Sequence, residues 1–359
     1  MAISGNKGEW SEIYTLFKVL GDKRLYSGSE SLEKVEHLVY PIVKVLRSEL
    51  QGNFEYTVDQ DIVVISSDKQ VLHRVSIQEF QAQALSLFEH VKDNHGSFSA
   101  PEAESFMRKI HCSSLKAAST VKTDITITIH DERTNQTPQL GFSIKSQLGN
   151  PSTLLNAGKT TNFKYEVVGK LSQESIVRIN SIDSRSKIKD RIEAVHKLGG
   201  RFQFIATEQN VFSNNLVLID SLLPQLLGHL VFEFYHSSHS KMIDLVKVLE
   251  QRNVLNFDDA SGHQFYTYKI KRFLTDVALG MMPSKVWSGL HDATGGYLIV
   301  KENGDVLCYH IYNRNEFESY LLNNTKLDTA SSSRHGFGVV FEEQGKLYMN
   351  LNLQIRFMK

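Results

Sequence analysis

Near the amino terminus, apolar side chains return every three or four residues, which places them on one face of a helix. They are Trp10, Ile13, Tyr14, Phe17 and Leu20. Other segments of the chain are predicted to be helical as well. The predicted helices cover 7–20, 31–51 (interrupted at Pro41), 78–93, 101–118, 185–198, 216–233 and 238–251.

Strict alternation marks a different segment, the decapeptide VKTDITITIH at 121–130. Its isoleucines fall on one face, and Asp124 shares the other face with two threonines, which predicts a strand. A polar stretch with turn residues follows, and GFSIKSQ at 141–147 alternates again, with Ser143, Lys145 and Gln147 on its polar side. We therefore expect a β-hairpin whose polar faces carry only two charges, Asp124 and Lys145.

The carboxy-terminal part is rich in predicted strands. Together with shorter strands earlier in the chain, they cover 54–58, 61–66, 71–77, 202–207, 296–301, 305–312, 336–343 and 346–357. Paired turn residues such as Asn303-Gly304 favour hairpins between them. The mixture predicts an α/β (α+β mixed) fold, divided into a first region over 1–235 that contains the hairpin and a β-rich region over 236–359.

Composition and charge narrow the class of protein. The 359 residues are 41% hydrophobic and 22% charged, which is typical of a globular protein. Forty basic and forty acidic residues cancel, which counts mildly against nucleic-acid binding. Residues 178–201 nevertheless hold seven Lys/Arg against three acids, and 269–285 hold four against one. Either run taken alone is more typical of a solvated helix face.

Other motifs exclude several classes. The two cysteines, Cys112 and Cys308, form no CxxC pair, which argues against a disulfide scaffold or a cysteine zinc site and suits a reducing cytoplasm. The amino terminus is not typical of a signal peptide, and polar residues interrupt the most apolar region, 216–235, so we expect no membrane span. HExxH, GxSxG, GxxxxGK[ST] and GxGxxG motifs are absent.

The hairpin charges suggest chemistry. A carboxylate such as Asp124 can hold a divalent metal through oxygen, and a lysine such as Lys145 can orient or deprotonate water. A plain cross-strand ion pair has the same pattern. This order of a strand with an Asp, a turn and a second strand with a lysine resembles the PD-(D/E)XK nuclease core. In that core a second carboxylate lies two residues before the lysine, and here Ser143 occupies its position. Gln147, two residues after the lysine, offers only a neutral oxygen.

The first helix can supply a further acid, and the resemblance to the PD-(D/E)XK core implies a glutamate on a helix packed beside the hairpin. Glu9 and Glu12 lie three residues apart and neighbour each other on that helix. Glu9 borders the apolar stripe and Glu12 lies further toward solvent, so we expect Glu9 to face the metal, with Glu12 as second choice. The alternative is that acids in a first helical turn only complement the helix dipole.

Three strings resemble the HpaII family of type II restriction endonucleases: GNKGEWSEIY, LGFSIKSQLGNPSTLLNAG, and LNNTKLDTASSSRHGFG with LNLQIRF. The resemblance implies a PD-(D/E)XK fold, with a nuclease core in 1–235 and DNA recognition in 236–359. It also implies Mg²⁺-dependent cleavage of double-stranded DNA at CCGG. Carried onto this chain, Asp124, the Ile144 carbonyl and Glu9 would bind the metal, Lys145 would position water, and Ser143 and Gln147 would complete a variant site.

CCGG contains only G·C pairs, for which arginine is the commonest reader in the major groove. The leading candidates lie in SSSRHGFG, at Ser333, Arg334 and His335, and the second candidates are Asn313 and Arg314. A surface loop without contacts to DNA has the same composition. A palindromic site favours a two-fold homodimer, and a restriction enzyme implies a cognate cytosine methyltransferase on a separate chain.

Three other functions fit the same sequence. A related nuclease would cut without preference for CCGG. A DNA-binding protein with an inactive site would bind and leave the duplex intact, with Ser143 as the sign of decay. A structural or regulatory protein would bind DNA only weakly, in a salt-sensitive manner.

Overall fold

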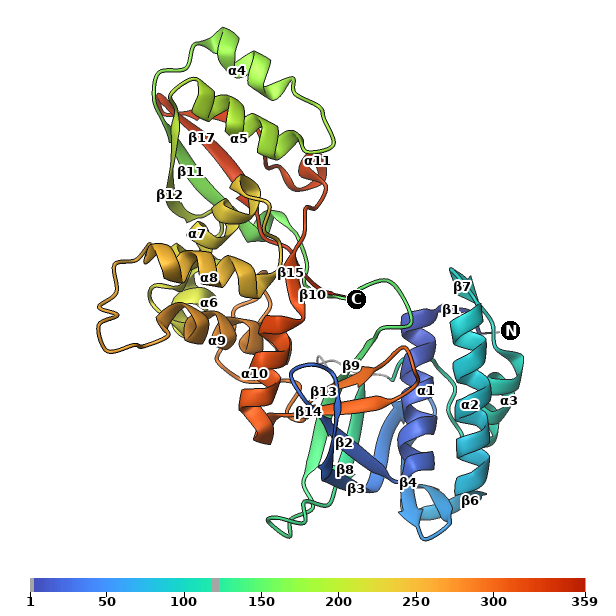
Figure 1. The fold of residues 1–359 in the computed structure, drawn as a ribbon. Helices are drawn as coiled ribbons and strands as arrows, with labels where there is room; N and C mark the ends of the chain where they lie inside the picture. The colour runs from blue at the N-terminus through green and yellow to red at the C-terminus, as the bar shows by residue number, and fades with distance from the viewer. Residues whose placement is uncertain (1–2, 118–122, 359) are drawn as a thin grey trace. The chain divides into compact units, whose positions relative to one another are not determined.

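The computed structural model describes residues 3–117 and 123–358, which form two compact units (Figure 1). The first unit combines the chain up to Ser152 with His291–Tyr320, and the second combines Thr153–Leu290 with Leu321–Met358. These units do not coincide with the predicted boundary after residue 235, because a strand near residue 300 pairs with the predicted hairpin. The predicted roles of the two regions stay predictions.

The first unit is built on a nine-stranded mixed sheet with the order β2-β14-β13-β9-β8-β3-β4-β5-β6. Its strands are β2 (Arg24–Gly28), β3 (Lys34–Glu49), β4 (Gly52–Asp59), β5 (Ile62–Ser67), β6 (Gln70–Ser76), β8 (Ile125–Ile129), β9 (Gln139–Ser146), β13 (Gly296–Val300) and β14 (Val306–His310). The predicted hairpin is confirmed as β8 and β9, which pair antiparallel. Strand β13 runs parallel to β9 on its other side.

The helix predicted over 31–51 is wrong, because this stretch forms the long strand β3. It contains four valines and an isoleucine, whose branched side chains favour a strand. From Tyr40 onward buried and less buried residues largely alternate, as a sheet with one covered face requires. Pro41 fits because β3 is irregular beside it, with a register shift between Ile42 and Lys44.

Helices α1 (Lys7–Asp22), α2 (Ile77–Asp93) and α3 (Pro101–Lys109) gather on one side of this sheet (Figure 1). Helix α1 begins at a capping box, in which the Asn6 side chain accepts hydrogen bonds from the backbone and Glu9 bonds back to Asn6. The apolar stripe of α1 is buried together with the isoleucines of β8 and with Phe142 and Ile144 of β9. The helices thereby cover the apolar face of the hairpin. A two-stranded sheet joins β1 (Gly5–Asn6) to β7 (Ser97–Phe98).

The second unit has two small sheets. One has the order β12-β11-β17-β16 and the other β10-β18-β15. Their strands are β10 (Thr153–Leu155), β11 (Asn162–Val168), β12 (Arg201–Thr207), β15 (Thr325–Leu327), β16 (Val340–Glu343), β17 (Lys346–Asn352) and β18 (Ile355–Phe357). The helices of this unit are α4 (Gln173–Asn180), α5 (Lys187–Lys197), α6 (Asn210–Ile219), α7 (Leu223–His236), α8 (Met242–Arg252), α9 (Phe265–Leu279) and α11 (Ser332–His335). Helix α10 (Arg314–Asn323) begins in the first unit and ends in the second.

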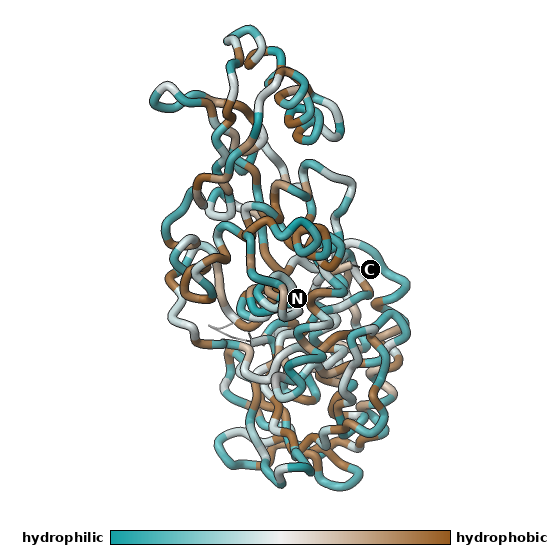
Figure 2. The backbone as a smooth tube through the Cα atoms, turned by 60° about the vertical axis from the view of Figure 1, so that its left-hand side comes forward, coloured by the Kyte–Doolittle hydropathy of each residue, from teal (hydrophilic) through white to brown (hydrophobic). Residues whose placement is uncertain are grey.

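The apolar region at 216–235 forms parts of two helices, α6 and α7, and not a single span. Among the described residues no single helix is long and apolar enough to cross a membrane, and the α6–α7 pair that passes together is bent by 109°. Hydrophobic and hydrophilic segments alternate along the coloured part of the chain in Figure 2. Cys112 and Cys308 are both buried and free.

Candidate active site

The register of the hairpin brings Asp124 opposite Ser143. Ile125 pairs with Phe142 across the two strands, and the Asp124 N–H donates to the Phe142 carbonyl at 2.9 Å. Asp124 therefore stands where β8 begins, beside the carboxyl-terminal half of β9. Lys145 follows Ser143 by two residues and shares its strand face. The prediction that these polar residues lie together is confirmed.

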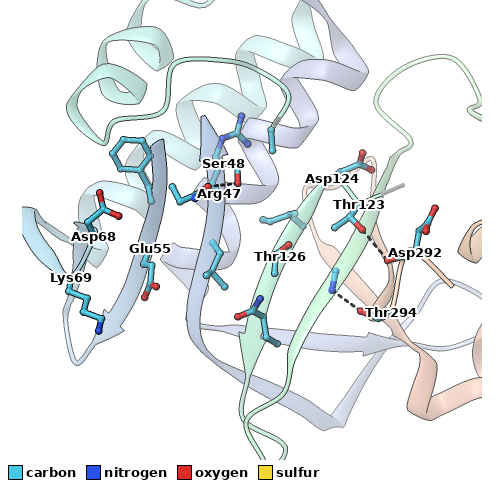
Figure 3. A pocket seen from close by; sticks show the side chains of 17 residues that line it. Arg47, Ser48, Glu55, Asp68, Lys69, Thr123, Asp124, Thr126, Asp292 and Thr294 are labelled. Atoms are coloured by element: carbon cyan, nitrogen blue, oxygen red, sulfur yellow. Dashed lines mark hydrogen bonds between the residues drawn. The ribbon is translucent and has the colours of Figure 1, made fainter. Parts of the chain in front are cut away.

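The Asp124 carboxylate is fixed through one of its oxygens. Its Oδ2 accepts a hydrogen bond from the Ile144 N–H at 2.7 Å and another from the Ser143 hydroxyl at 3.0 Å. Within the described part of the chain, Oδ1 accepts none, so one oxygen remains for another ligand. Figure 3 shows Asp124 at the end of its strand, on the wall of a groove that Arg47 and Asp292 also line.

Lys145 is joined to Asp124 through a hydroxyl. The Lys145 ammonium donates to the Ser143 Oγ at 3.1 Å, and Ser143 in turn donates to Asp124. The predicted alternative of a plain ion pair is not what the structure shows, because Ser143 stands between the charges. Ser143 is buried and Lys145 half-buried. Burial lowers the pKa of Lys145, and the nearby Asp124 and Glu12 carboxylates oppose that change.

Glu9 takes part in the cap at the start of its own helix, α1. Its Oε2 accepts the Asn6 N–H at 2.9 Å, and its Oε1 lies 3.2 Å from the Lys116 Nζ. The backbone hydrogen bond from Asn6 is the main reason why the pKa of Glu9 is lowered, with Lys116 assisting. Glu9 is therefore already satisfied as a capping residue and as an ion-pair partner.

Glu12 has the opposite environment. It is half-buried, and among the described residues its carboxylate has no hydrogen-bond or ion-pair partner. Burial raises the pKa of Glu12 to about 8, and the charge of Asp124 adds to this rise. It lines a groove of about 760 Å³ together with Lys145, Lys116 and Glu9. The acid of α1 that is coupled to the hairpin charges is thus Glu12, the second choice from the sequence.

A metal ion fits two of these groups. Asp124 and Glu12 are two carboxylates close enough to repel each other, and a cation between them would relieve the repulsion that raises the pKa of Glu12. Among the described residues no cluster of three or more His, Cys, Asp or Glu side chains is arranged to hold a metal. Further ligands would therefore be water, phosphate or neutral oxygens.

The remaining predicted site residues lie nearby but are less informative. The Ile144 N–H donates a hydrogen bond to Asp124. Metal binding by the Ile144 carbonyl stays a prediction. The Gln147 N–H donates to the Val300 carbonyl at 2.9 Å, which continues the pairing of β9 with β13. Gln147 does not line the groove that holds Glu12 and Lys145.

The predicted DNA-reading residues fall in different units. Ser333, Arg334 and His335 belong to the second unit, in the short helix α11, and Arg334 is exposed. The Asn162 side-chain amide donates a hydrogen bond to the His335 carbonyl at 3.0 Å. In the first unit, the Asn313 amide donates to the Tyr40 hydroxyl at 3.0 Å.

Arg314 also has a partner, because its Nε donates a hydrogen bond to the Glu318 carboxylate at 2.6 Å. Asn313 and Arg314 thus both have partners within their own unit, although Arg314 is exposed, as Arg334 is.

Sequence reasoning missed two residues beside Lys145. The Lys145 Nζ lies 5.2 Å from the centre of the Tyr297 ring, on the neighbouring strand β13. Lys116 ion-pairs with Glu9 and faces Glu12. Neither had a sequence signal, because Tyr297 is about 150 residues from the hairpin in the chain and Lys116 lies in an irregular segment after α3.

Comparisons with known proteins agree on one family. The family model described as "HpaII restriction endonuclease" matches residues 6–357. The chain is 45% identical over 360 residues to the protein named "Type II restriction enzyme HpaII" from Haemophilus parainfluenzae, and the match covers 99% of each chain. No solved structure matches significantly.

Proposed function

The chain belongs to the HpaII restriction endonuclease family, and from this premise we propose that it hydrolyses both strands of double-stranded DNA at CCGG. The relative named HpaII supports this specificity. The observation that carries the chemistry is the chain of contacts from Lys145 through Ser143 to Asp124, with Glu12 beside it. We further propose that this hairpin is a PD-(D/E)XK core in which a serine replaces the second carboxylate.

The proposed cofactor is Mg²⁺. Asp124, through its free Oδ1, and Glu12 would hold it, because hard cations prefer carboxylate oxygens. When bound, the ion would polarise the scissile phosphate and favour ionisation of a water molecule. Glu12 takes the role that the sequence analysis gave to Glu9, since Glu9 is occupied at the helix start.

The protein side chains supply position and proton control. The Ile144 N–H and the Ser143 hydroxyl hold the Asp124 carboxylate in one orientation. Ser143 also holds the Lys145 amine, whose lowered pKa increases the fraction able to accept a proton from the attacking water. After hydrolysis the same amine, now protonated, stabilises the negative phosphate product.

Recognition is proposed to rest on α11, where exposed Arg334 would contact guanine, with Ser333 and His335 contacting phosphate or bases. A palindromic site is most simply read by a homodimer. A methyltransferase on another chain would protect the host DNA.

A direct test uses two short duplexes of equal composition, one with CCGG and one with GGCC. Wild-type protein and Glu12→Gln are incubated with each, in Mg²⁺ and in EDTA. We expect only the CCGG duplex to be cut, only in Mg²⁺ and only by the wild type. Equal cutting of both duplexes would contradict the specificity. Tight binding without cutting would favour the second candidate, a DNA-binding protein inactivated by the serine at position 143.

A further inference from the structure

Tyr297 stands beside the proposed active site on a third strand. Strand β13 runs parallel to β9, and its register places Tyr297 beside Ser143. The Lys145 Nζ lies 5.2 Å from the centre of the Tyr297 ring. Only 2% of Tyr297 is exposed. Asp124, Ser143 and Tyr297 thus occupy neighbouring positions across three strands, with Lys145 in contact with both Ser143 and Tyr297.

The Tyr297 ring is immobilised by its surroundings. The Phe317 ring packs edge-on against it, with 5.4 Å between centroids. The backbone of Tyr297 is also held on both sides, because β13 pairs with β9 and with β14. An ammonium within about 6 Å of an aromatic face is attracted by the ring quadrupole. A fixed ring therefore gives Lys145 a second, directional hold in addition to Ser143.

We propose that Tyr297 is a positioning residue for Lys145 in the cleavage reaction, an inference that rests on the proposed function. Lysine has a long flexible side chain, and one hydrogen bond to Ser143 leaves its amine free to rotate about that contact. The ring removes this freedom and keeps the amine directed toward Asp124. The contact with Lys145 is made by the aromatic face of Tyr297.

The test compares Tyr297→Leu with Tyr297→Phe, and uses Tyr309→Leu as a matched control. Tyr309 is equally buried and pairs with Tyr297, but it makes no contact with Lys145 among the described interactions. Single-turnover cleavage of a CCGG duplex is measured in Mg²⁺, and DNA affinity is measured separately in EDTA. Thermal unfolding shows how much of each variant is folded.

We expect Tyr297→Leu to slow cleavage about tenfold, which corresponds to ~1.4 kcal/mol, with DNA affinity unchanged. Tyr297→Phe restores most of the rate because it keeps the ring. Tyr309→Leu lowers the melting temperature and leaves the rate of the folded protein near the wild-type value. A wild-type rate in Tyr297→Leu, or an equal loss in Tyr297→Phe, overturns the proposal.

A second measurement does not depend on cleavage. Melting temperatures are compared for Tyr297→Leu, Lys145→Met and the double variant. Shifts that fall short of additivity by about 2 °C show that the two side chains interact, whereas additive shifts overturn the proposal. If the wild type cuts no DNA, the proposed function fails by itself, and this cycle still decides whether Tyr297 holds Lys145.

Discussion

Replacing Glu12 by glutamine is expected to stabilise the metal-free protein at alkaline pH and to abolish cleavage. Burial, with Asp124 nearby, raises the pKa of Glu12 from an ordinary value of 4.5 to about 8. Between these values the folded protein keeps a proton that the unfolded chain has lost. Stability therefore falls as the pH rises through this window. The charged groups facing Glu12 are Asp124, Lys116, Arg47, Glu9 and Lys145.

The size of the effect follows from that difference in pKa. Taken in full, a rise from 4.5 to about 8 corresponds to ~5 kcal/mol at 1.36 kcal/mol per pKa unit. Glu12 is only half-buried and lines a water-accessible groove, so solvent screening reduces this to roughly 2–3 kcal/mol. Glu12→Gln removes the titration. It should match the wild type near pH 5 and exceed its stability by that amount above pH 8.

The matched control is Glu9→Gln on the same helix. Glutamine at position 9 can still accept the Asn6 N–H and keep the capping box, but it loses the ion pair with Lys116 and the negative charge at the helix start, so the variant should be destabilised by roughly 0.5–1 kcal/mol. The assay is urea unfolding in EDTA at pH 5 and pH 8.5, followed by cleavage in Mg²⁺. Glu12→Gln should lose cleavage, while Glu9→Gln should keep most of it. The reasoning is refuted if Glu12→Gln gains no stability at pH 8.5, or if Glu9→Gln is the variant that gains.

Three further variants test other contacts. Ser143→Ala removes a donor to the Asp124 carboxylate and should slow single-turnover cleavage about tenfold or more at unchanged DNA affinity; an unchanged rate would show that the bridge is dispensable. Arg334→Ala should reduce the preference for CCGG over GGCC duplex by ~1–3 kcal/mol in binding assays, whereas equal weakening of both would indicate a phosphate contact. Arg47→Met leaves the buried Glu49 carboxylate without its ion-pair partner, with only hydroxyl donors remaining, and should cost ~3–5 kcal/mol in urea unfolding; a loss below ~1 kcal/mol would contradict this.

The hairpin was predictable because its signal is local. Strict alternation fixes which side chains share a face, and a single polar loop fixes the pairing of β8 with β9. From these two facts, Asp124, Ser143 and Lys145 had to lie together. Ser143 was also correctly noted as a departure from the usual pattern, but its bridging role depends on side-chain rotamers that no sequence pattern encodes.

Long-range features were not predictable in this way. The helical periodicity identified both Glu9 and Glu12, but how α1 is placed beside the end of the hairpin decides which of them is coupled to Asp124. The capping box at Asn6 was the one local signal that argued against Glu9. Tyr297 reaches the site only because β13 pairs with β9, a contact between segments about 150 residues apart. Strand β3 was mistaken for a helix because its apolar residues also recur at helical spacing.

The most direct test of the central claim is digestion of a plasmid with purified protein in Mg²⁺, run beside Lys145→Ala, with the fragment ends sequenced. The account predicts discrete fragments whose ends all lie within CCGG, and their loss in the variant. Fragments that persist with Lys145→Ala, or an intact plasmid with well-folded wild-type protein, would contradict it.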